Sequence, residues 1–380
     1  MRLSKKINQL IHSVMVRYVR NQYRKKVKSV LSKHPKMKLI SKGADVEKHL
    51  ALWNRLLPGC SVEWFTLFSE VSSRQDYRFV PEDVFYGVVE RCLNNCDAAG
   101  FGIEDKSDVC FYFPKKFQPK AFLRYVRGVY FDDSFNPITR KQAQNILESL
   151  NEDIVGKPSS GSCGGSNVRC FKRNSENQYV AKDIPLTLDW IELNFDAYVL
   201  QERVCQDKAT ASFNPKSLNT CRMMTFRRPW SGEVSVIATM LRMGCTDEIV
   251  DNLAAGGVSV DVDANGKLAP FAVNKYFEKV THHPASGIMF DGFKVPYYDA
   301  MAQVVCEVAS RIPSYNLLSF DVVAREDGTP CVIEINATSM TLAQLQTSRP
   351  LFGDETEQLV QWCEENRSKF DTFKHLRTFY

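Results

Sequence analysis

The stretch SFDVVAREDGTPCVIEIN near the C-terminal end constrains the fold more than any other part of this chain. It predicts two apolar strands joined by a turn at Asp327-Gly328, with Asp321 on the first strand and Glu334 and Asn336 on the second. Because strand side chains alternate between faces, Glu334 and Asn336 point the same way, about 7 Å apart along the backbone. Three oxygen donors on rigid strands suit Mg²⁺, which takes one or two carboxylates and completes its shell with water and phosphate. The alternative is a hairpin that carries two solvent-exposed acids.

Length and composition are those of an ordinary globular protein. With 380 residues, one to three domains are expected, and 44% apolar with 24% charged residues allow a sizeable core. No apolar run approaches the roughly 18 residues that span a bilayer. Polar residues also interrupt the segment from Ile7 to Val19, where a secretory leader would lie. We therefore expect a cytoplasmic protein.

The twelve cysteines are scattered through apolar segments. This distribution favours buried free thiols in a reducing compartment over a disulfide framework. Cys92 and Cys96 lie one helical turn apart, but no second Cys or His pair follows them. A zinc site is therefore not expected.

Positive charge is concentrated at the N-terminal end. Residues 1–38 hold twelve Lys and Arg and no Asp or Glu, whereas the rest of the chain has 37 basic and 44 acidic residues. Apolar residues recur at helical spacing from Leu3 to Tyr18, and basic residues crowd between Arg17 and Lys28. Such a basic amphipathic helix suits an anionic membrane surface or another polyanion; the alternative is a solvated helix that packs on its own domain. Nucleic acid is not an expected partner, because the remaining chain is acidic and has no basic-aromatic motif.

A glycine-rich hairpin is predicted in the middle of the chain. Ile154–Pro158 has the pattern of a short strand, Val168–Phe171 that of a returning strand, and SSGSCGGS lies between them. This is not a Walker A loop, since no Gly-Lys-Ser/Thr ends it and no helix pattern follows. Glycines let backbone N–H groups approach phosphate oxygens, and Lys157 supplies a point charge. The hairpin could therefore fold over phosphates as a flap.

Three further strands are predicted after the hairpin. Ala197–Val204 runs into an extended segment whose backbone could pair with an adenine ring, although many edge strands share this pattern. Asn219–Met224 and Ala238–Arg242 follow, and each contains one arginine, Arg222 or Arg242, in an apolar run. Burying an unpaired charge is costly, so each arginine is expected to have an anionic partner. A structural ion pair is the simplest interpretation for both.

Together these segments resemble the ATP-grasp ligases. The blocks KP-SSGSCGG, VLQERV, NTCR, ATMLR, DNLAAGG, SFDVV and VIEIN occur in that order over roughly residues 150–350. They are most similar to the sugar-transfer-associated ATP-grasp proteins and, in part, to the ribosomal-protein glutamate ligases. The resemblance implies an α+β fold in which two α+β subdomains clasp ATP, here with an N-terminal α/β region and a basic N-terminal helix.

The resemblance also implies nucleotide contacts at matching positions. An earlier lysine, the hairpin lysine, the flap, the adenine-facing segment and a ribose contact would together hold ATP. Lys115, Lys116 and Lys120 compete for the earlier lysine, and we select Lys120. The implied nucleotide-binding residues are Lys120, Lys157, Ser160, Gly161, Ser162, Gly164, Gly165, Gln201, Glu202, Arg203, Val204 and Asp207.

The reaction centre would combine metal ligands with cationic side chains. The implied metal ligands, for two Mg²⁺ that bridge the β- and γ-phosphates, are Asp321, Glu334 and Asn336. The implied catalytic residues are Arg242, Arg222 and Asn252. Phosphoryl transfer needs positioning and electrostatic stabilisation more than a nucleophile, and no Gly-x-Ser-x-Gly elbow is present to supply one.

The implied activity is ATP-dependent ligation of a carboxylate to an amine through an acyl phosphate, in the assembly of capsule or O-antigen polysaccharide. The partners would be small molecules, such as a uronic acid sugar and an amino acid, with the inner face of the cell membrane or a lipid-linked glycan bound through residues 1–38. Two alternatives stay open. One is an ATP-grasp kinase that phosphorylates a small molecule or sugar, and the other is a non-catalytic nucleotide-binding adaptor of a glycan assembly complex.

Two segments bear on the acceptor. After EIN the ligases often continue with a small residue, Pro and Gly, whereas this chain continues with ATSMT at 337–341. His283 lies in HHPASG, which is similar to a motif of the sugar-associated branch. It could touch substrate or serve as a structural loop residue.

Five units are predicted along the chain. They are a basic arm at 1–45, an N-terminal domain at 46–150, a flap subdomain at 151–211, a catalytic subdomain at 212–350, and a C-terminal helix and tail at 351–380. Helices are expected at Pro81–Ala99, Thr139–Asn151, Tyr298–Ile312 and Glu355–Lys369, and strand or loop at Phe111–Pro114.

Overall fold

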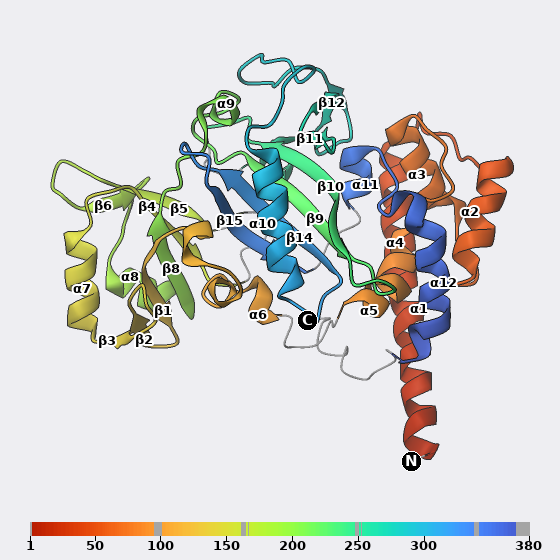
Figure 1. Cartoon of the computed structure of the whole chain (residues 1–380), viewed down its shortest axis with the longest axis horizontal. Helices are drawn as coiled ribbons and strands as arrows, with labels where there is room; N and C mark the ends of the chain where they lie inside the picture. The colour runs from red at the N-terminus through yellow and green to blue at the C-terminus, as the bar shows by residue number, and fades with distance from the viewer. Residues whose placement is uncertain are drawn as a thin grey trace.

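The computed structural model describes residues 2–94, 101–160, 165, 167–247, 251, 253–337 and 342–369. Its described part contains two antiparallel sheets and a layer of helices built from both ends of the chain (Figure 1). The eight-stranded sheet lies at one end of the molecule, the seven-stranded sheet in the centre and the helical layer at the other end (Figure 1). None of the described helices is both long and apolar enough to span a membrane.

The helical layer surrounds a long N-terminal helix. Its members are α1 (Arg2–Lys33), α2 (Ala44–Asn54), α3 (Val62–Ser72), α4 (Glu82–Val84), the π-helical turn η1 (Phe85–Val89), α5 (Glu90–Leu93), α11 (Leu342–Thr347) and α12 (Thr356–Asn366). The predicted helix at Pro81–Ala99 is thus present from Glu82 to Leu93, and residues 95–100 lie outside the described part. The predicted C-terminal helix is also confirmed, with Leu359 and Cys363 buried and Trp362 only partly so.

The second half of α1 packs on its own domain. Val19 and Val27 are buried, and Val27 belongs to a core cluster that includes Trp64 of α3. Lys26 Nζ lies 2.6 Å from Glu82 Oε2, and Arg24 Nε lies 3.5 Å from an Asp83 oxygen. The acids of neighbouring helices therefore neutralise part of the basic segment.

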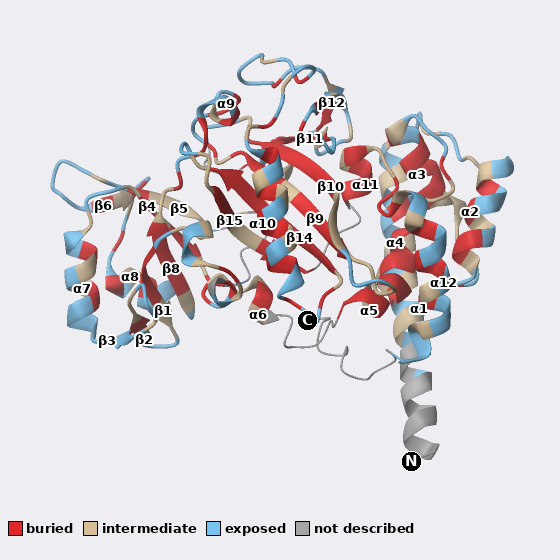
Figure 2. Ribbon diagram, in the orientation of Figure 1, coloured by how far each residue is buried: buried red, intermediate tan, exposed pale blue. Residues whose placement is uncertain are grey.

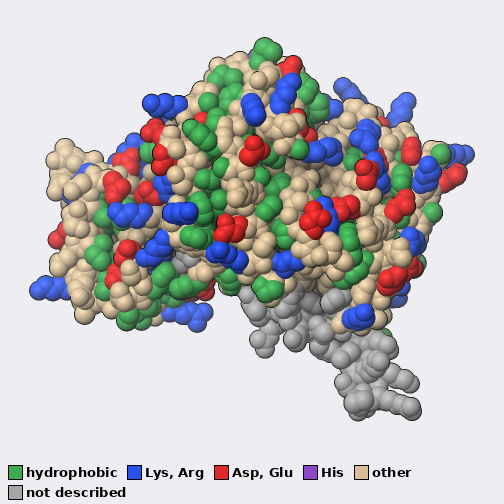
Figure 3. Space-filling model, in the orientation of Figure 1, with side chains coloured by type: hydrophobic (Ala, Val, Ile, Leu, Met, Phe, Trp, Pro, Cys, Tyr) green, Lys and Arg blue, Asp and Glu red, His purple; other side chains and the backbone are tan. Residues whose placement is uncertain are grey.

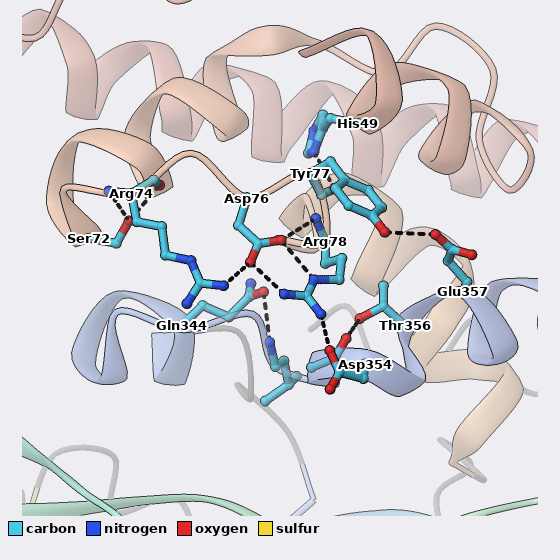
Figure 4. Close-up of polar contacts among 12 residues, drawn as sticks. His49, Ser72, Arg74, Asp76, Tyr77, Arg78, Gln344, Asp354, Thr356 and Glu357 are labelled. Carbon is cyan, nitrogen blue, oxygen red and sulfur yellow. Dashed lines mark hydrogen bonds and ion pairs between the residues drawn. The ribbon is translucent and has the colours of Figure 1, made fainter. Parts of the chain in front are cut away.

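The loop between α3 and α4 ties the helical layer to the C-terminal segment (Figure 4). Asp76 accepts hydrogen bonds from the side chains of Arg74 and Arg78, and Arg78 also contacts Asp354. Gln344 of α11 accepts from Val80 N at 2.9 Å and donates to Val80 O at 3.0 Å. These contacts hold α11 and α12 against helices from the start of the chain.

The eight-stranded sheet has the order β3-β2-β1-β8-β4-β5-β6-β7. Its strands are β1 (Ala121–Val126), β2 (Val129–Phe131), β3 (Pro137–Ile138), β4 (Ile154–Pro158), β5 (Arg169–Arg173), β6 (Tyr179–Ala181), β7 (Ile184–Pro185) and β8 (Ala197–Glu202). Helices α7 (Arg140–Ser149) and α8 (Leu188–Asn194) cover one face. The predicted β4–β5 hairpin is confirmed, and the predicted helix at Thr139–Asn151 begins with a capping box between Thr139 and Gln142. The sheet continues across residue 150, because β1–β3 pair with strands that follow it.

Short helical segments connect the helical layer to this sheet. They are α6 (Phe101–Glu104), η3 (Val109–Tyr112) and η4 (Lys115–Phe117). The strand or loop expected at Phe111–Pro114 is therefore a 3-10 turn at its start. The aromatic residues that suggested a strand pack individually instead: the ring of Phe111 lies 4.5 Å from that of Phe135.

The seven-stranded sheet has the order β13-β12-β11-β10-β9-β14-β15. Its strands are β9 (Thr220–Arg227), β10 (Val234–Met243), β11 (Val258–Val262), β12 (Leu268–Val273), β13 (Lys279–Val280), β14 (Leu317–Ala324) and β15 (Pro330–Asn336). The predicted helix at Tyr298–Ile312 forms as α10 (Tyr298–Ser310) and packs on one face through a stripe that includes Met301, Val305 and Val308. Buried residues fill the strands beneath α10 (Figure 2).

Charge is mixed over the surface seen in Figure 3. Lys and Arg side chains alternate with Asp and Glu side chains across both sheets and the helical layer in this view (Figure 3). The net charge of +5 therefore forms no single extended patch on the described residues of this face.

Candidate active site

The two faces of the seven-stranded sheet have different surroundings. Met223 of β9 and Phe320 of β14 face the core beneath α10, whereas Phe226 of β9 and Leu317 of β14 face the helical layer. Farther along this second face, the strands carry polar side chains. Because strand residues alternate, the residues on this face include Arg222, Arg242, Ser319, Asp321, Glu334 and Asn336.

Asp321 is bound by two arginines. Arg222 donates from Nε and Nη2 to the two carboxylate oxygens, each at 2.8 Å, and Arg242 Nη1 lies 3.3 Å from both oxygens. Burial works to raise the pKa of Asp321, but the two guanidinium groups outweigh it and hold that pKa below its usual range. The anionic partner expected for each arginine is therefore the same residue.

Arg242 has a second partner that the sequence did not suggest. Its Nη2 donates to Asp251 Oδ1 at 3.0 Å. The other oxygen of Asp251 accepts from the backbone N–H of Thr220 at 3.1 Å and from the Thr220 hydroxyl. Asp251 precedes Asn252, the predicted catalytic residue, which lies outside the described residues.

The predicted metal ligands occupy two neighbouring rungs of the β14–β15 ladder. Asp321 pairs with Glu334, and Ser319 pairs with Asn336. Asn336 Nδ2 and Ser319 Oγ are buried without a hydrogen-bond partner among the described residues. Two carboxylates and an amide oxygen on adjacent rungs have the hard-donor chemistry that Mg²⁺ prefers, so the residues fit such an ion. No group of three His, Cys, Asp or Glu that could hold a metal occurs in the described part, since the third donor here is an amide.

Lys157 of β4 faces this site from the eight-stranded sheet and is almost fully buried. Burial lowers the pKa of Lys157 to about 8; Lys106 lowers it further, and the charges of Glu334 and Asp321 oppose the shift. The preceding residue, Gly156, allows this placement. A Cβ at Gly156 would lie 2.6 Å from the Tyr198 hydroxyl oxygen, so a larger residue would displace the strand.

Lys106 is a site residue that sequence reasoning missed. Its Nζ lies 3.3 Å from Glu334 Oε1, its side chain is 7% exposed, and its backbone N–H donates to Ser159 O at 2.8 Å. The segment Asp105–Asp108 has the polar composition of a solvated turn, and no apolar periodicity marks it. The only local signal is an Asp turn, in which Asp105 Oδ1 accepts from the Ser107 backbone N–H at 2.8 Å.

The lysine selected from the sequence lies at the surface. The Lys120 side chain is 65% exposed, and its Nζ lies 4.0 Å from Glu152 Oε1. Its backbone joins β8, because Lys120 O accepts from Glu202 N at 2.9 Å. Lys115 and Lys116 are also exposed.

Only part of the predicted flap lies within the described residues. Ser160 is exposed, and Gly165 has a φ of 76°, which favours glycine. Gly161, Ser162 and Gly164 lie outside the described part.

The predicted adenine-facing segment connects the two sheets. Gln201 is buried, and Glu202 accepts a hydrogen bond at 2.6 Å from Arg325, the residue after β14. Val204 packs with Val323 of β14 and Cys331 of β15 in a small apolar cluster. The segment therefore presents both backbone groups and an apolar surface at the junction of the sheets.

Three other predicted residues have defined structural partners. Arg203 Nη1 lies 3.5 Å from Asp153 Oδ2. Asp207 caps α9 (Lys208–Ala211) by accepting from the N–H groups of Ala209 and Thr210 through Oδ1. His283 is buried, with Nε2 3.1 Å from Gly244 O and Nδ1 3.1 Å from Ser286 Oγ, as expected for a structural loop residue.

Comparison with solved structures finds distant similarity to ATP-grasp enzymes. An L-amino acid ligase from Bacillus licheniformis is 13% identical with a TM-score of 0.40, over 70% of this chain and 48% of that one. The ADP complex of N5-carboxyaminoimidazole ribonucleotide synthetase is 12% identical with a TM-score of 0.36, over 63% and 45% of the two chains. The ATP-grasp ligase PsnB, complexed with a minimal precursor, Mg and ADP, is 13% identical with a TM-score of 0.35, over 65% and 54%. The matched region thus spans about half the length of each of these proteins.

A sequence comparison with curated proteins gives no match. A family model described as sugar-transfer associated ATP-grasp matches residues 119–358, which is more than half of the chain and contains both sheets. The lysine, arginine and acidic side chains described above all lie within this match, apart from Lys106. The chain therefore has the ATP-grasp fold and belongs to the sugar-transfer-associated ATP-grasp family.

Proposed function

We propose that this protein is an ATP-dependent ligase that joins a carboxylate to an amine and releases ADP and phosphate. The observation that supports this most directly is the arrangement of charge around the Asp321–Glu334 rung. Two arginines bind Asp321, and Lys106 and Lys157 lie beside Glu334. Cations gathered around two acids are what a site for a metal-bound triphosphate requires.

Each residue would have a defined task with ATP bound. Lys106 and Lys157 would hold phosphate oxygens, with the flap from Ser160 to Gly165 above them. The segment from Gln201 to Val204 would face adenine. Asp321, Glu334 and Asn336 would hold Mg²⁺, which when bound neutralises phosphate charge during transfer.

The chemistry proposed for the site has two steps. A carboxylate oxygen of the acceptor attacks the γ-phosphorus of ATP, and ADP leaves. An amine then attacks the acyl carbon of the resulting acyl phosphate, and inorganic phosphate leaves as the amine loses a proton. Arg222 and Arg242 would stabilise the negative charge that develops on the transferring phosphoryl oxygens.

We further propose substrates from cell-surface polysaccharide assembly, with a uronic acid or an amino acid as the carboxylate. This rests on the family assignment. The test mixes the protein with Mg-ATP and paired candidate acids and amines. ADP and phosphate should appear only when both substrates are present, and the product mass should equal the two substrates minus water. Formation of AMP and pyrophosphate would contradict the proposal, and a stable phosphorylated product would instead identify a kinase.

The first half of α1 supports a peripheral membrane role. Leu10 and Val14 are 66% and 57% exposed, and Arg17 on the next turn is exposed as well. Exposed apolar side chains beside basic ones suit an anionic bilayer surface. The protein should co-float with vesicles that contain anionic lipid and not with neutral vesicles, and the double variant Leu10→Glu/Val14→Glu should lose this binding. Equal recovery of the wild type from both kinds of vesicle would argue against the role.

A further inference from the structure

Asp251 is a buried acid outside the residues assigned above. Burial raises the pKa of Asp251, and the charge of Arg242 opposes that shift. Its two oxygens are used by different partners: Oδ1 accepts from Arg242, and Oδ2 accepts from the backbone and the hydroxyl of Thr220. Thr220 in turn sits opposite Arg242 in the β9–β10 ladder. The carboxylate is therefore fixed on one side by the strand that neighbours the arginine it binds.

Arg242 is closer to Asp251 than to Asp321. The Nη2 contact with Asp251 is 3.0 Å, whereas both contacts of Nη1 with Asp321 are 3.3 Å. Asp321 is already engaged by the two 2.8 Å hydrogen bonds from Arg222. Two guanidinium groups thus share Asp321, but only Arg242 has a second carboxylate.

This difference matters when Asp321 changes partners. Under the proposed function, Asp321 must release guanidinium groups to bind the metal, and a buried arginine that loses its only anion carries a large desolvation penalty. Asp251 removes that penalty for Arg242, because one carboxylate stays bound to Nη2 while Nη1 becomes available for a phosphoryl oxygen.

We propose that Asp251, held by Thr220, is a positioning residue that keeps Arg242 in the site while Asp321 exchanges the arginines for a metal-bound nucleotide. This inference rests on the proposed nucleotide-binding function. Without Asp251, Arg242 would depend on Asp321 alone and would compete with the metal for it.

The test compares AMP-PNP binding with and without Mg²⁺, by calorimetry, in the full-length protein. In Asp251→Asn, the Mg²⁺ concentration that gives half-maximal AMP-PNP binding should rise by about tenfold or more, the cost typical of losing an outer partner of a metal site. Metal-free AMP-PNP, measured in EDTA, should bind as well as to wild type or more tightly, because the variant removes a negative charge. A purely structural role would instead weaken both kinds of binding together.

Thr220 variants give an independent reading if Asp251→Asn does not fold. Thr220→Val removes the hydroxyl donor to Asp251 and should raise the Mg²⁺ requirement by about two- to fivefold, in line with one lost hydrogen bond. Thr220→Ser keeps the donor and should restore wild-type behaviour.

Two matched controls exclude general effects of substitution. Thr225→Val changes a buried threonine on the same strand whose hydroxyl donates only to Leu318 O. Asp261→Asn breaks a comparable Asp–Arg pair, with Arg349 at 2.6 Å, on β11. Neither should change the Mg²⁺ requirement.

The outcomes separate this inference from the proposed function. A wild-type protein that binds no AMP-PNP with Mg²⁺ would overturn both. Nucleotide binding by the wild type, with an unchanged Mg²⁺ requirement in folded Asp251→Asn and in Thr220→Val, would overturn the role of Asp251 alone.

Discussion

The ammonium nitrogen of Lys106 lies 3.3 Å from Oε1 of Glu334, so a turn before the first sheet contacts the last strand of the second. The backbone of Lys106 is also bound to Ser159 O, at the end of β4. Lys106 therefore links the strand that carries Lys157 with the strand that carries two of the predicted metal ligands.

We predict that Lys106 and not Lys120 contributes to nucleotide affinity. Lys106→Met should weaken the binding of Mg-AMP-PNP by about ten- to hundredfold, because a charge-assisted hydrogen bond contributes about 1.5–3 kcal/mol. Lys120→Met removes an exposed charge and should stay within about twofold of wild type. Calorimetric titration of both variants decides between them, and the reverse ranking would restore the lysine selected from the sequence.

The lowered pKa of Lys157 predicts that nucleotide affinity falls as the pH rises through about 8. Above this value the folded protein increasingly carries a neutral amine, which donates more weakly to phosphate. The check is the Mg-AMP-PNP dissociation constant between pH 7 and 9 in wild type and in Lys157→Met. A pH-independent constant in wild type would contradict the assignment.

The same group has the opposite effect on stability. Its pKa is lower in the folded chain than in the unfolded chain, so the unfolded chain binds the proton more readily between about pH 8 and the usual lysine value. The penalty for burying the charge is therefore fully present below pH 8 and is lost as the pH rises above it. Lys157→Met should stabilise the protein at pH 7 by about 1–3 kcal/mol in urea unfolding, although it loses nucleotide binding.

Ser319→Ala should not reduce the stability of the nucleotide-free protein. The Ser319 hydroxyl is buried without a hydrogen-bond partner among the described residues, so its removal relieves a desolvation penalty of about 1 kcal/mol. Ser69→Ala, in α3, is a matched control with a second buried, unpartnered hydroxyl. Urea unfolding measures both, and a loss of more than about 1 kcal/mol in Ser319→Ala alone would reveal a hydrogen bond at that hydroxyl.

Gln344→Leu should strongly destabilise the attachment of the C-terminal helices. Both backbone groups of Val80 bond to this buried amide, and leaving them unsatisfied costs about 2–4 kcal/mol. Urea unfolding and limited proteolysis near α11 and α12 provide the measurement. Gln361→Leu, an exposed glutamine of α12 that bonds only to Glu365, should change stability by less than about 0.5 kcal/mol.

The sequence by itself determined which side chains share a strand face. Asp321, Glu334 and Asn336 lie on the same face of β14 and β15 because side-chain alternation is a property of each strand, and apolar neighbours mark the strands. The helices at Thr139 and Tyr298 follow for the same reason, since a capping box and an apolar stripe are local signals.

Only the tertiary structure decided which charges meet. Arg222, Arg242 and Asp251 converge because β14 pairs with β9 and β9 with β10, and strand order is not encoded in the periodicity of any one strand. Lys106 lies in a polar turn whose composition resembles that of any solvated loop, and only chain closure between the two sheets brings it to Glu334. Local patterns set the direction of a side chain, whereas its partners depend on contacts between segments that are far apart in the chain.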